Sequence, residues 1–271
     1  MPRRERWPAA LTIAGSDSSG GAGIQADLKV MTSLKVHGLT AISCLTAQNP
    51  DEVRTLKAVT ADFLTQQIIA VESFYRLKAV KTGMLYSSTL IRAVVDYFQA
   101  NPGPKLVVDP VIKSSSGTEL LKPSAIKVLH NELFPIAEII TPNISEAELL
   151  IGHELTSLED VAEAAVALHQ EWGCHVLIKG GHLRTANMAI DILANEDGIK
   201  QLKAPRARIR SPHGTGCTYA SAIASFLAKG NKTTEAVELS KHYVTQSIHN
   251  VYKTEREYCL RQSDPTLSSN P

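Results

Sequence analysis

Short apolar runs alternate along this chain with segments whose apolar residues recur at helical spacing. The first run, Ala10–Ala14, is followed by Ile24, Leu28, Met31 and Leu34. Runs of this kind are typical of strands buried on both faces, and helices between such strands make them parallel. The pattern therefore predicts an α/β fold with a mostly parallel central sheet and helices on both faces, in three α/β/α layers.

The same alternation continues over most of the chain. Further strands are expected at Leu39–Leu45, Leu77–Thr82, Lys105–Asp109, Ala137–Thr141 and Cys174–Lys179, and helices at Asp62–Phe74, Thr215–Ala228 and Thr234–Val251. Thr156 and Glu159 have the spacing of a capping box and predict the start of another helix. The rhythm breaks after Met188, where Ile190–Leu193 and Lys200–Leu202 predict two antiparallel strands joined by a turn.

Length and composition limit the class of protein. The chain has 271 residues with no internal repeat or linker, which predicts a single domain over residues 1–271, with flexible ends at 1–8 and 261–271. Hydrophobic residues make up 44% and charged residues 20%, as in globular proteins. The 28 basic and 27 acidic residues leave a net charge of +1, which argues against a nucleic-acid binder.

The sequence also points to a compartment. No apolar stretch approaches the length of a membrane span, so no membrane partner is expected. The run Ala9–Ala14 behind the basic N-terminus is shorter than a signal-peptide core. The four cysteines are scattered without a CxxC pair, which is typical of a reduced, cytoplasmic protein.

A glycine-rich loop follows the first predicted strand. Within it Gly21–Ala26 matches the G-x-G-x-x-A pattern of dinucleotide sites, but it starts several residues after the strand, and the second strand ends in Gln48 rather than in an acid. We therefore reject a dinucleotide site and interpret Gly15–Gly23 as a ligand loop. Asp17 would present its carboxylate to a substrate hydroxyl or amine, or would cap local backbone amides; both interpretations stay open.

A second glycine turn, Gly214-Thr215-Gly216-Cys217, leads into a long apolar helix. Free backbone N–H groups and the helix dipole at such a start bind anions and suit a transferring phosphoryl group. The same position is expected to lower the pKa of Cys217. The alternative is an ordinary helix start with a small buried cysteine. The chain has no G-x-x-x-x-G-K-[ST] motif, which argues against a P-loop fold.

Polar residues end several other predicted strands. Asn143 and Glu146 lie three apart at a helix entrance, where their oxygens suit hydrated Mg²⁺, although a plain capping pair is slightly favoured. Asp109, Lys179–Gly180 and Gln48 each follow a strand. Ligands of parallel sheets bind at this edge, so these side chains are candidates for one site.

Taken together and in order, these segments resemble one family. The strings concerned are Ala14–Asp27, Thr46–Gln48, Lys81–Leu85, Val108–Val111, Thr141–Glu146, Lys179–His182 and Gly214–Cys217. The chain resembles the hydroxymethylpyrimidine/phosphomethylpyrimidine kinases of thiamine biosynthesis, which have the ribokinase-like fold. The resemblance runs from about Ala10 to the helix after Thr234.

The resemblance implies an ATP-dependent kinase that acts twice. It would phosphorylate the hydroxymethyl group of 4-amino-5-hydroxymethyl-2-methylpyrimidine and then the resulting monophosphate. Gln48 and Asp17 would hold the pyrimidine, with Gly15, Met84 and Asp109 lining the pocket. A glutamine amide can answer both the donor and the acceptor of an aminopyrimidine edge.

The resemblance also implies roles on the phosphate side. Asn143, Lys179 and Gly180 would bind ATP and its phosphates, and Glu146 and Asp109 would bind Mg²⁺. The anion hole would be formed by Gly214, Thr215 and Gly216, with Cys217 as the catalytic base. A homodimer is implied as well.

The chain departs from related patterns in two places. Many ribokinase-like kinases have an aspartate where Cys217 stands. The subfamily that this chain resembles has a cysteine at that position, so the departure is from the superfamily only. In the flap after Asp109, Lys113 stands two positions before the place where family members typically have a lysine. No phosphate role is therefore assigned to a flap lysine.

Two alternatives remain. Pyridoxal kinases of the same fold usually place a second cysteine in the flap, where this chain has Ser114. A non-catalytic pyrimidine-binding protein would have no need of the complete Gly214–Cys217 turn.

Overall fold

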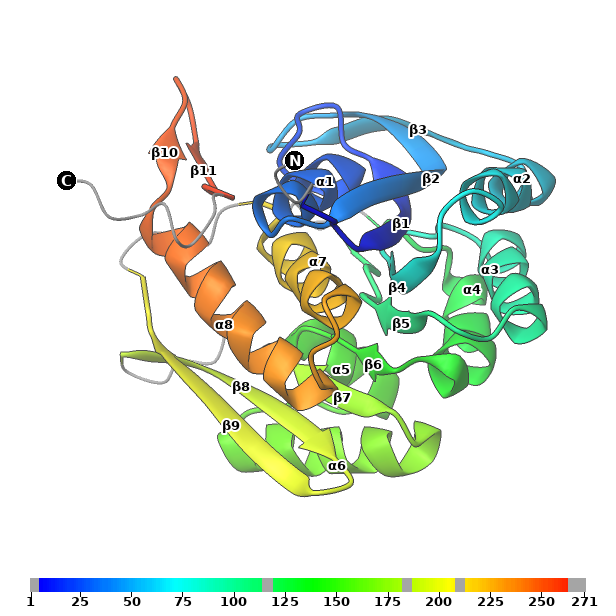
Figure 1. The fold of residues 1–271 in the computed structure, drawn as a ribbon. Coiled ribbons are helices and arrows are strands. Elements are labelled where there is room, and N and C mark those ends of the chain that lie inside the picture. The colour runs from blue at the N-terminus through cyan, green and yellow to red at the C-terminus, as the bar shows by residue number, and fades with distance from the viewer. Residues whose placement is uncertain (1–4, 114–118, 182–186, 208–212, 263–271) are drawn as a thin grey trace.

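One sheet runs through the computed structural model, which describes residues 5–113, 119–181, 187–207 and 213–262. Its strands are β1 (Ala9–Ser16), β2 (His37–Gln48), β3 (Val53–Ala58), β4 (Leu77–Thr82), β5 (Lys105–Val108), β6 (Ile139–Ile140), β7 (His175–Ile178), β8 (Met188–Asn195) and β9 (Gly198–Pro205). Their order is β3-β2-β1-β4-β5-β6-β7-β8-β9 (Figure 1). Every pair from β2 to β7 is parallel, whereas β3, β8 and β9 join antiparallel.

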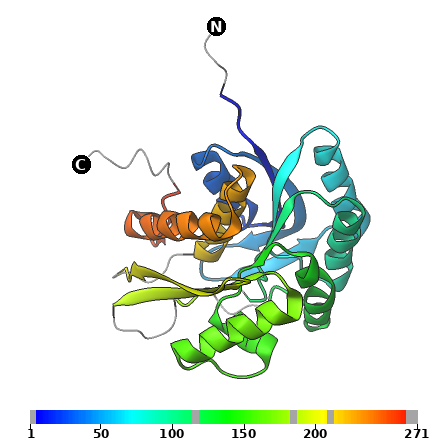
Figure 2. The same cartoon turned by 60° about the horizontal axis from the view of Figure 1, so that its bottom comes forward.

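Helices cover both faces of this sheet. They are α1 (Gly23–Ser33), α2 (Ala61–Glu72), α3 (Ser88–Ala100), α4 (Pro123–Val128), α5 (Ile144–Ile151), α6 (Leu158–Trp172), α7 (Thr215–Ala228) and α8 (Thr233–His249). Helices α1, α7 and α8 pack on one face and α2 to α6 on the other, so the sheet lies between two helical layers (Figures 1 and 2). The predicted three-layer, mostly parallel α/β fold is confirmed.

Alternation along the strands divides the core into two layers. In β5, Val107 packs with α7 and α8, whereas its neighbours Leu106 and Val108 belong to the cluster on the opposite face. All three are at most 3% exposed. This explains why the strand sequences are apolar throughout: both faces of each central strand are buried.

The predicted elements are found close to their expected bounds. Strand β3 and a C-terminal hairpin were missed, and one helix cap was assigned to the wrong residues. Strand β3 was not predicted, because it lies at the sheet edge and its outward side chains are charged. A small C-terminal hairpin, β10 (Tyr252–Lys253) with β11 (Tyr258–Cys259), was not predicted either. The capping box of α6 is formed by Ser157 and Asp160, so its assignment to Thr156 and Glu159 was wrong.

The two ends of the chain are described only in part. Of the segments expected to be flexible, 1–4 and 263–271 lie outside the described residues. Gln262 donates to Thr218 Oγ1 at 3.2 Å, so the hairpin end contacts the start of α7. Among the described residues, no helix combines the length and the apolar character needed to cross a membrane.

The corrected capping box gives the first testable prediction. Ser157 Oγ accepts the Asp160 N–H at 3.0 Å, so Ser157→Ala should lower the free energy of unfolding by about 1 kcal/mol. Glu159→Ala should cost much less, because no capping bond involves that side chain. Urea unfolding followed by circular dichroism measures both; equal losses would restore the Thr156–Glu159 assignment.

Candidate active site

The carboxyl ends of the parallel strands meet at one edge of the sheet. Backbone hydrogen bonds continue from strand to strand just past these ends: Gly83 N to Ile13 O (2.9 Å), Asp109 N to Thr82 O (3.0 Å), Thr141 N to Val108 O (2.9 Å) and Lys179 N to Pro142 O (2.9 Å). These bonds fix the positions from which the polar side chains project. The candidate residues, distant in sequence, are thereby brought to one edge.

Asp17 lies in the loop after β1 and is only 3% exposed. Its carboxylate accepts the backbone N–H groups of Ser19 (2.9 Å) and Ala22 (2.8 Å). Burial opposes ionisation, but the hydrogen bonds from His213, Ser19 and Ala22 outweigh it and lower the pKa of Asp17 to about 2. The local capping interpretation is therefore correct, and the carboxylate also faces a residue from outside its loop.

That residue is His213, which sequence reasoning missed. Its Nε2 lies 2.9 Å from Asp17 Oδ2 and 3.2 Å from Gln48 Nε2. Asp17 and Gln48 are the two residues expected to hold the pyrimidine, so the imidazole stands between them. The one signal in the sequence that could have identified His213 is its place directly before Gly214. A turn that contacts the first loop also brings the preceding residue to that loop.

Gly15 and Met84, which the resemblance assigns to the lining of the pocket, lie next to each other. A Cβ at Gly15 would lie 2.4 Å from Met84 Cε, and Met84 itself is 7% exposed. The thioether thus lies against the start of the first loop and gives this side of the site an apolar wall.

The turn at Gly214 joins the two glycine loops. Gly214 has φ 84°, and a Cβ there would lie 1.8 Å from the carbonyl oxygen of Gly21. It is the N-cap of α7, and as a glycine it has no side chain that could cap the helix start. A helix start of this kind, with the N–H groups of Gly216 and Cys217 in its first turn, suits an anion beside the first loop.

A buried ion pair lies against this turn. Lys179 Nζ donates to Asp109 Oδ1 at 2.8 Å, with 14% and 4% of the two side chains exposed. A Cβ at Gly216 would lie 3.4 Å from Lys179 Nζ and 3.8 Å from Asp109 Oδ2. Burial opposes the charge on Lys179, but the carboxylates of Asp109 and Glu146 raise its pKa above the usual range. A permanent cation therefore stands beside the helix start.

Asn143 and Glu146 form the capping box of α5. Asn143 Oδ1 accepts Glu146 N–H, and Glu146 Oε2 accepts Asn143 N–H, both at 2.9 Å. Glu146 Oε1 accepts Ile112 N–H at 3.2 Å. Burial raises the pKa of Glu146. Both oxygens of Glu146 are thus engaged by backbone groups, and the capping interpretation is correct.

The thiol of Cys217 does not behave as expected. Burial raises its pKa to about 11; Lys81 and the backbone N–H of Gly23 lower it, while Asp27 and Asp109 raise it further. The expectation of a lowered pKa was therefore wrong. The helix start offers partial charges, whereas the loss of hydration on packing against the sheet is the larger effect.

Gly180 and its neighbours complete the edge. The Gly180 N–H donates to Asp191 Oδ1 at 3.0 Å, so this amide points into the protein. Asp191 in turn accepts Lys241 Nζ at 2.7 Å. Two positions used in the sequence analysis lie outside the described residues: His182, the last residue of the Lys179–His182 string, and Ser114 in the flap after Asp109.

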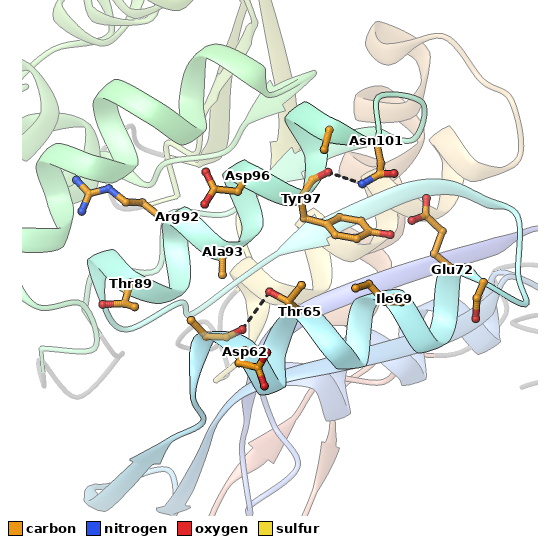
Figure 3. A pocket seen from close by; sticks show the side chains of 13 residues that line it. Asp62, Thr65, Ile69, Glu72, Thr89, Arg92, Ala93, Asp96, Tyr97 and Asn101 are labelled. Carbon is orange, nitrogen blue, oxygen red and sulfur yellow. Dashed lines mark hydrogen bonds between the residues drawn. The ribbon is translucent and has the colours of Figure 1, made fainter.

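A separate groove lies between α2 and α3, with a volume of about 860 Å³. Figure 3 shows Thr65 and Ile69 from α2 opposite Ala93 and Tyr97 from α3. None of the site residues described above lines it. Its place against the outer helices separates it from the strand ends.

Fold and site together define a ribokinase-like kinase architecture, and comparison with known proteins narrows it to a family. The family model described as "Phosphomethylpyrimidine kinase" matches residues 17–260. This chain belongs to that family.

Curated relatives agree. A hydroxymethylpyrimidine/phosphomethylpyrimidine kinase of Rhizobium meliloti is 43% identical over 88% of this chain and 90% of its own length. A thiamine biosynthesis bifunctional protein of Geobacter sulfurreducens is 43% identical over 91% of this chain. The chain spans about half the length of that relative and of two similar plant proteins.

Solved structures show the same fold. A pyridoxal kinase of Bacillus subtilis in complex with ADP matches with a TM-score of 0.89, at 33% identity over 97% of this chain and 100% of that chain. A phosphomethylpyrimidine kinase of Clostridium difficile matches with a TM-score of 0.79, at 41% identity over 89% of this chain and 99% of that chain.

The contact between the two glycine loops can be tested. In Gly214→Ala the new methyl group would meet Gly21 O and push the loops apart, and a displacement of about 1 Å at a reacting centre costs roughly 100-fold in rate. The control is Gly173→Ala, which has the same left-handed backbone (φ 68°) but nothing within 4 Å.

Gly173→Ala should lose about 1–2 kcal/mol of stability from backbone strain, and Gly214→Ala at least as much because its methyl group also meets Gly21 O; thermal unfolding measures both. Only Gly214→Ala should lose activity, measured as the kcat/KM obtained from the rate of ADP release. Equal activities in the two variants would contradict the role of the loop contact.

Proposed function

We propose that this protein is an ATP-dependent kinase that phosphorylates 4-amino-5-hydroxymethyl-2-methylpyrimidine and then its monophosphate, in thiamine biosynthesis. The observation that carries the proposal is the direct contact between Gly21 and Gly214. It brings the loop that would hold the pyrimidine beside a helix start with a glycine N-cap, which suits a transferring phosphoryl group.

Gln48, Asp17, Gly15 and Met84 form the proposed pyrimidine side of the site. The Gln48 amide offers a donor and an acceptor to the aminopyrimidine edge. Asp17 is ionised near neutral pH because its pKa is about 2, and it holds His213 at 2.9 Å. Met84, packed against Gly15, would cover a face of the ring.

On the phosphate side we assign Lys179 to the phosphates of ATP, with Asn143 and Gly180 shaping the loops that border them. The ADP complex of the related pyridoxal kinase supports a nucleotide at this fold's site. Asp109 lines the junction of the two sides, because it pairs with Lys179 and faces Gly216. It would therefore contact substrate as well as the phosphate region.

The residues fit hydrated Mg²⁺ in a limited way. Among the described residues no group of three or more His, Cys, Asp or Glu is placed to hold a metal. Mg²⁺ needs only one or two carboxylates when phosphates and waters complete its shell. Asp109 Oδ2, which faces Gly216, would be the direct ligand, and Glu146 would act through water because both its oxygens accept backbone N–H groups. Bound there, the ion would neutralise phosphate charge.

Phosphoryl transfer depends mainly on positioning and charge stabilisation. The N–H groups at Gly214–Cys217 and the Lys179 ammonium would stabilise the charge on the transferring group. Cys217, at the same helix start, would take the proton from the substrate hydroxyl as a thiolate. Since burial holds the Cys217 pKa near 11, the thiolate is a minor form at neutral pH.

Pyridoxal kinase activity is the second candidate. The Bacillus subtilis pyridoxal kinase matches with the higher TM-score, but the phosphomethylpyrimidine kinase has the higher identity. A coupled assay of ADP release with the pyrimidine and with pyridoxal separates the candidates. Turnover of the pyrimidine supports the proposal, preference for pyridoxal replaces it, and binding without turnover supports a non-catalytic pyrimidine-binding protein.

Four further assignments belong to the proposal. The described strands β1 to β9 share one sheet, which supports a single domain. The four cysteines are free, which supports a reducing, cytoplasmic location. A homodimer follows from the resemblance, and the near-zero net charge supports the absence of a nucleic-acid partner. Light scattering at monomer mass across micromolar dilution would contradict the dimer.

The pyrimidine contact of Gln48 leads to a quantitative expectation. Gln48→Ala would leave buried polar atoms of the substrate unpaired, at about 1–3 kcal/mol, or roughly 5- to 150-fold in the pyrimidine KM. The KM for ATP should hardly change. Steady-state kinetics with each substrate varied measures both values, and an unchanged pyrimidine KM would remove Gln48 from the site.

The proposed base leads to a pH dependence. Only the thiolate accepts a proton, and the pKa of Cys217 is about 11, so kcat should rise between about pH 7 and about pH 9.5, by up to roughly tenfold per pH unit. Cys217→Ala should be lower by ~10²–10⁴-fold and should lack this rise.

Cys217→Asp provides the matched comparison, because a carboxylate can take the same proton and should restore part of the activity. The pyrimidine Kd, measured by calorimetry, should be nearly equal in all three proteins. If Cys217→Ala keeps the wild-type kcat and pH profile, the backbone N–H groups of the Gly214–Gly216 turn and the Lys179 ammonium account for catalysis without the thiol.

A further inference from the structure

A completely buried ion pair lies beneath the helix start. Lys81 in β4 and Asp27 in α1 both have no exposed side-chain surface. Lys81 Nζ donates to both Asp27 oxygens, at 3.0 and 2.9 Å. Ser221 from α7 donates to Oδ1 at 2.5 Å, and Thr12 from β1 donates to Oδ2 at 2.6 Å. Each carboxylate oxygen therefore has two donors, and four elements converge on one charge.

This arrangement is not explained by stability alone. Removing two ions from water costs several kcal/mol each, and replacing a buried pair by apolar residues of similar volume is often neutral or stabilising. The neighbouring residues, such as Ala10, Ala79 and Ala220, are apolar and fully buried. An apolar pair would therefore suit this layer of the core, and the charges call for another reason.

The position of the pair points to Cys217. Ser221 follows Cys217 by four residues on α7, so both side chains lie on the same face of the helix. Gly83 follows Lys81 at the tip of β4, and a Cβ there would lie 2.9 Å from Lys81 Nζ. The ammonium group thus lies close under the edge of the sheet where the proposed site is formed.

Four charged groups act on Cys217 from the elements packed around it. Lys81 comes from β4 and Asp27 from α1, while Asp109 and Lys179 follow β5 and β7. Lys81 is the strongest of the influences that lower the pKa of the thiol, and its effect exceeds the opposing effect of Asp27. Because the effect of Lys81 is the larger of the two, the pair as a whole favours negative charge on the sulfur.

We propose that Lys81, held in place by Asp27, Ser221 and Thr12, is a positioning residue that stabilises negative charge on Cys217 Sγ. The inference rests on the proposed role of Cys217 as base. In that step the substrate O–H bond breaks and an S–H bond forms. The oxygen's electron pair forms the bond to the γ-phosphorus as the bond to the leaving ADP oxygen breaks. Lys81 keeps its protons throughout.

The test replaces both charges together, because Lys81→Met alone would leave Asp27 buried without a cation. In Lys81→Met/Asp27→Asn, the rate of Cys217 alkylation by iodoacetamide, followed by peptide mass spectrometry from about pH 7 to about pH 10, should fall at least roughly tenfold, the equivalent of one pKa unit. The control is Lys105→Met/Glu138→Gln, a partly exposed ion pair at the other end of β5, which should leave the rate unchanged.

Thermal unfolding confirms that each variant is folded. Wild-type alkylation in the folded Lys81→Met/Asp27→Asn protein would overturn the inference. So would an equal loss in the control, since the effect would then not be specific to this pair.

A double-mutant cycle separates this inference from the function on which it rests. The charge replacement should lower kcat at least roughly tenfold in the wild-type background and hardly at all in Cys217→Ala, because the two act through the same atom. Equal losses in both backgrounds would show that Lys81 acts elsewhere. If Cys217→Ala alone keeps full activity, the base assignment fails, and the alkylation rates still decide whether Lys81 acts on the thiol.

Discussion

The parallel register of the central strands is the constraint on which the rest of this structure depends. Because β1, β2, β4, β5, β6 and β7 run in one direction, all of their carboxyl ends lie at one edge. Backbone hydrogen bonds such as Asp109 N to Thr82 O and Lys179 N to Pro142 O continue the ladder into the loops. The polar side chains of the candidate site are therefore held by main-chain geometry, which tolerates little displacement.

Glycine contacts bring the two halves of the proposed site together. The carbonyl oxygen of Gly21 occupies the space where a side chain at Gly214 would be. This close approach brings His213 to Asp17 and Gln48, and it puts the start of α7 beside the first loop. The loop that would bind the acceptor and the turn that would stabilise the phosphoryl group thus form one continuous surface.

Paired charges surround the proposed catalytic residue. Lys179 with Asp109 lies beside Gly216, and Lys81 with Asp27 lies beneath α7. Each lysine keeps its proton because a carboxylate is within 3.0 Å. This arrangement offers fixed positive charge to an anionic transition state without a large net charge in the core. At the thiol of Cys217, however, desolvation outweighs the effect of Lys81, so the pKa of the thiol stays raised.

Local patterns in the sequence determined the α/β layers, most strand and helix positions, and the glycine loops, because burial on both faces of a strand requires continuous apolar runs. They also indicated Gln48, Asp109 and Lys179 as strand-end residues. Only the tertiary structure decided the rest. The bonds of His213, the Lys81–Asp27 pair and the raised pKa of Cys217 all depend on groups far apart in the chain. Such long-range desolvation and pairing leave no periodic signal in the sequence.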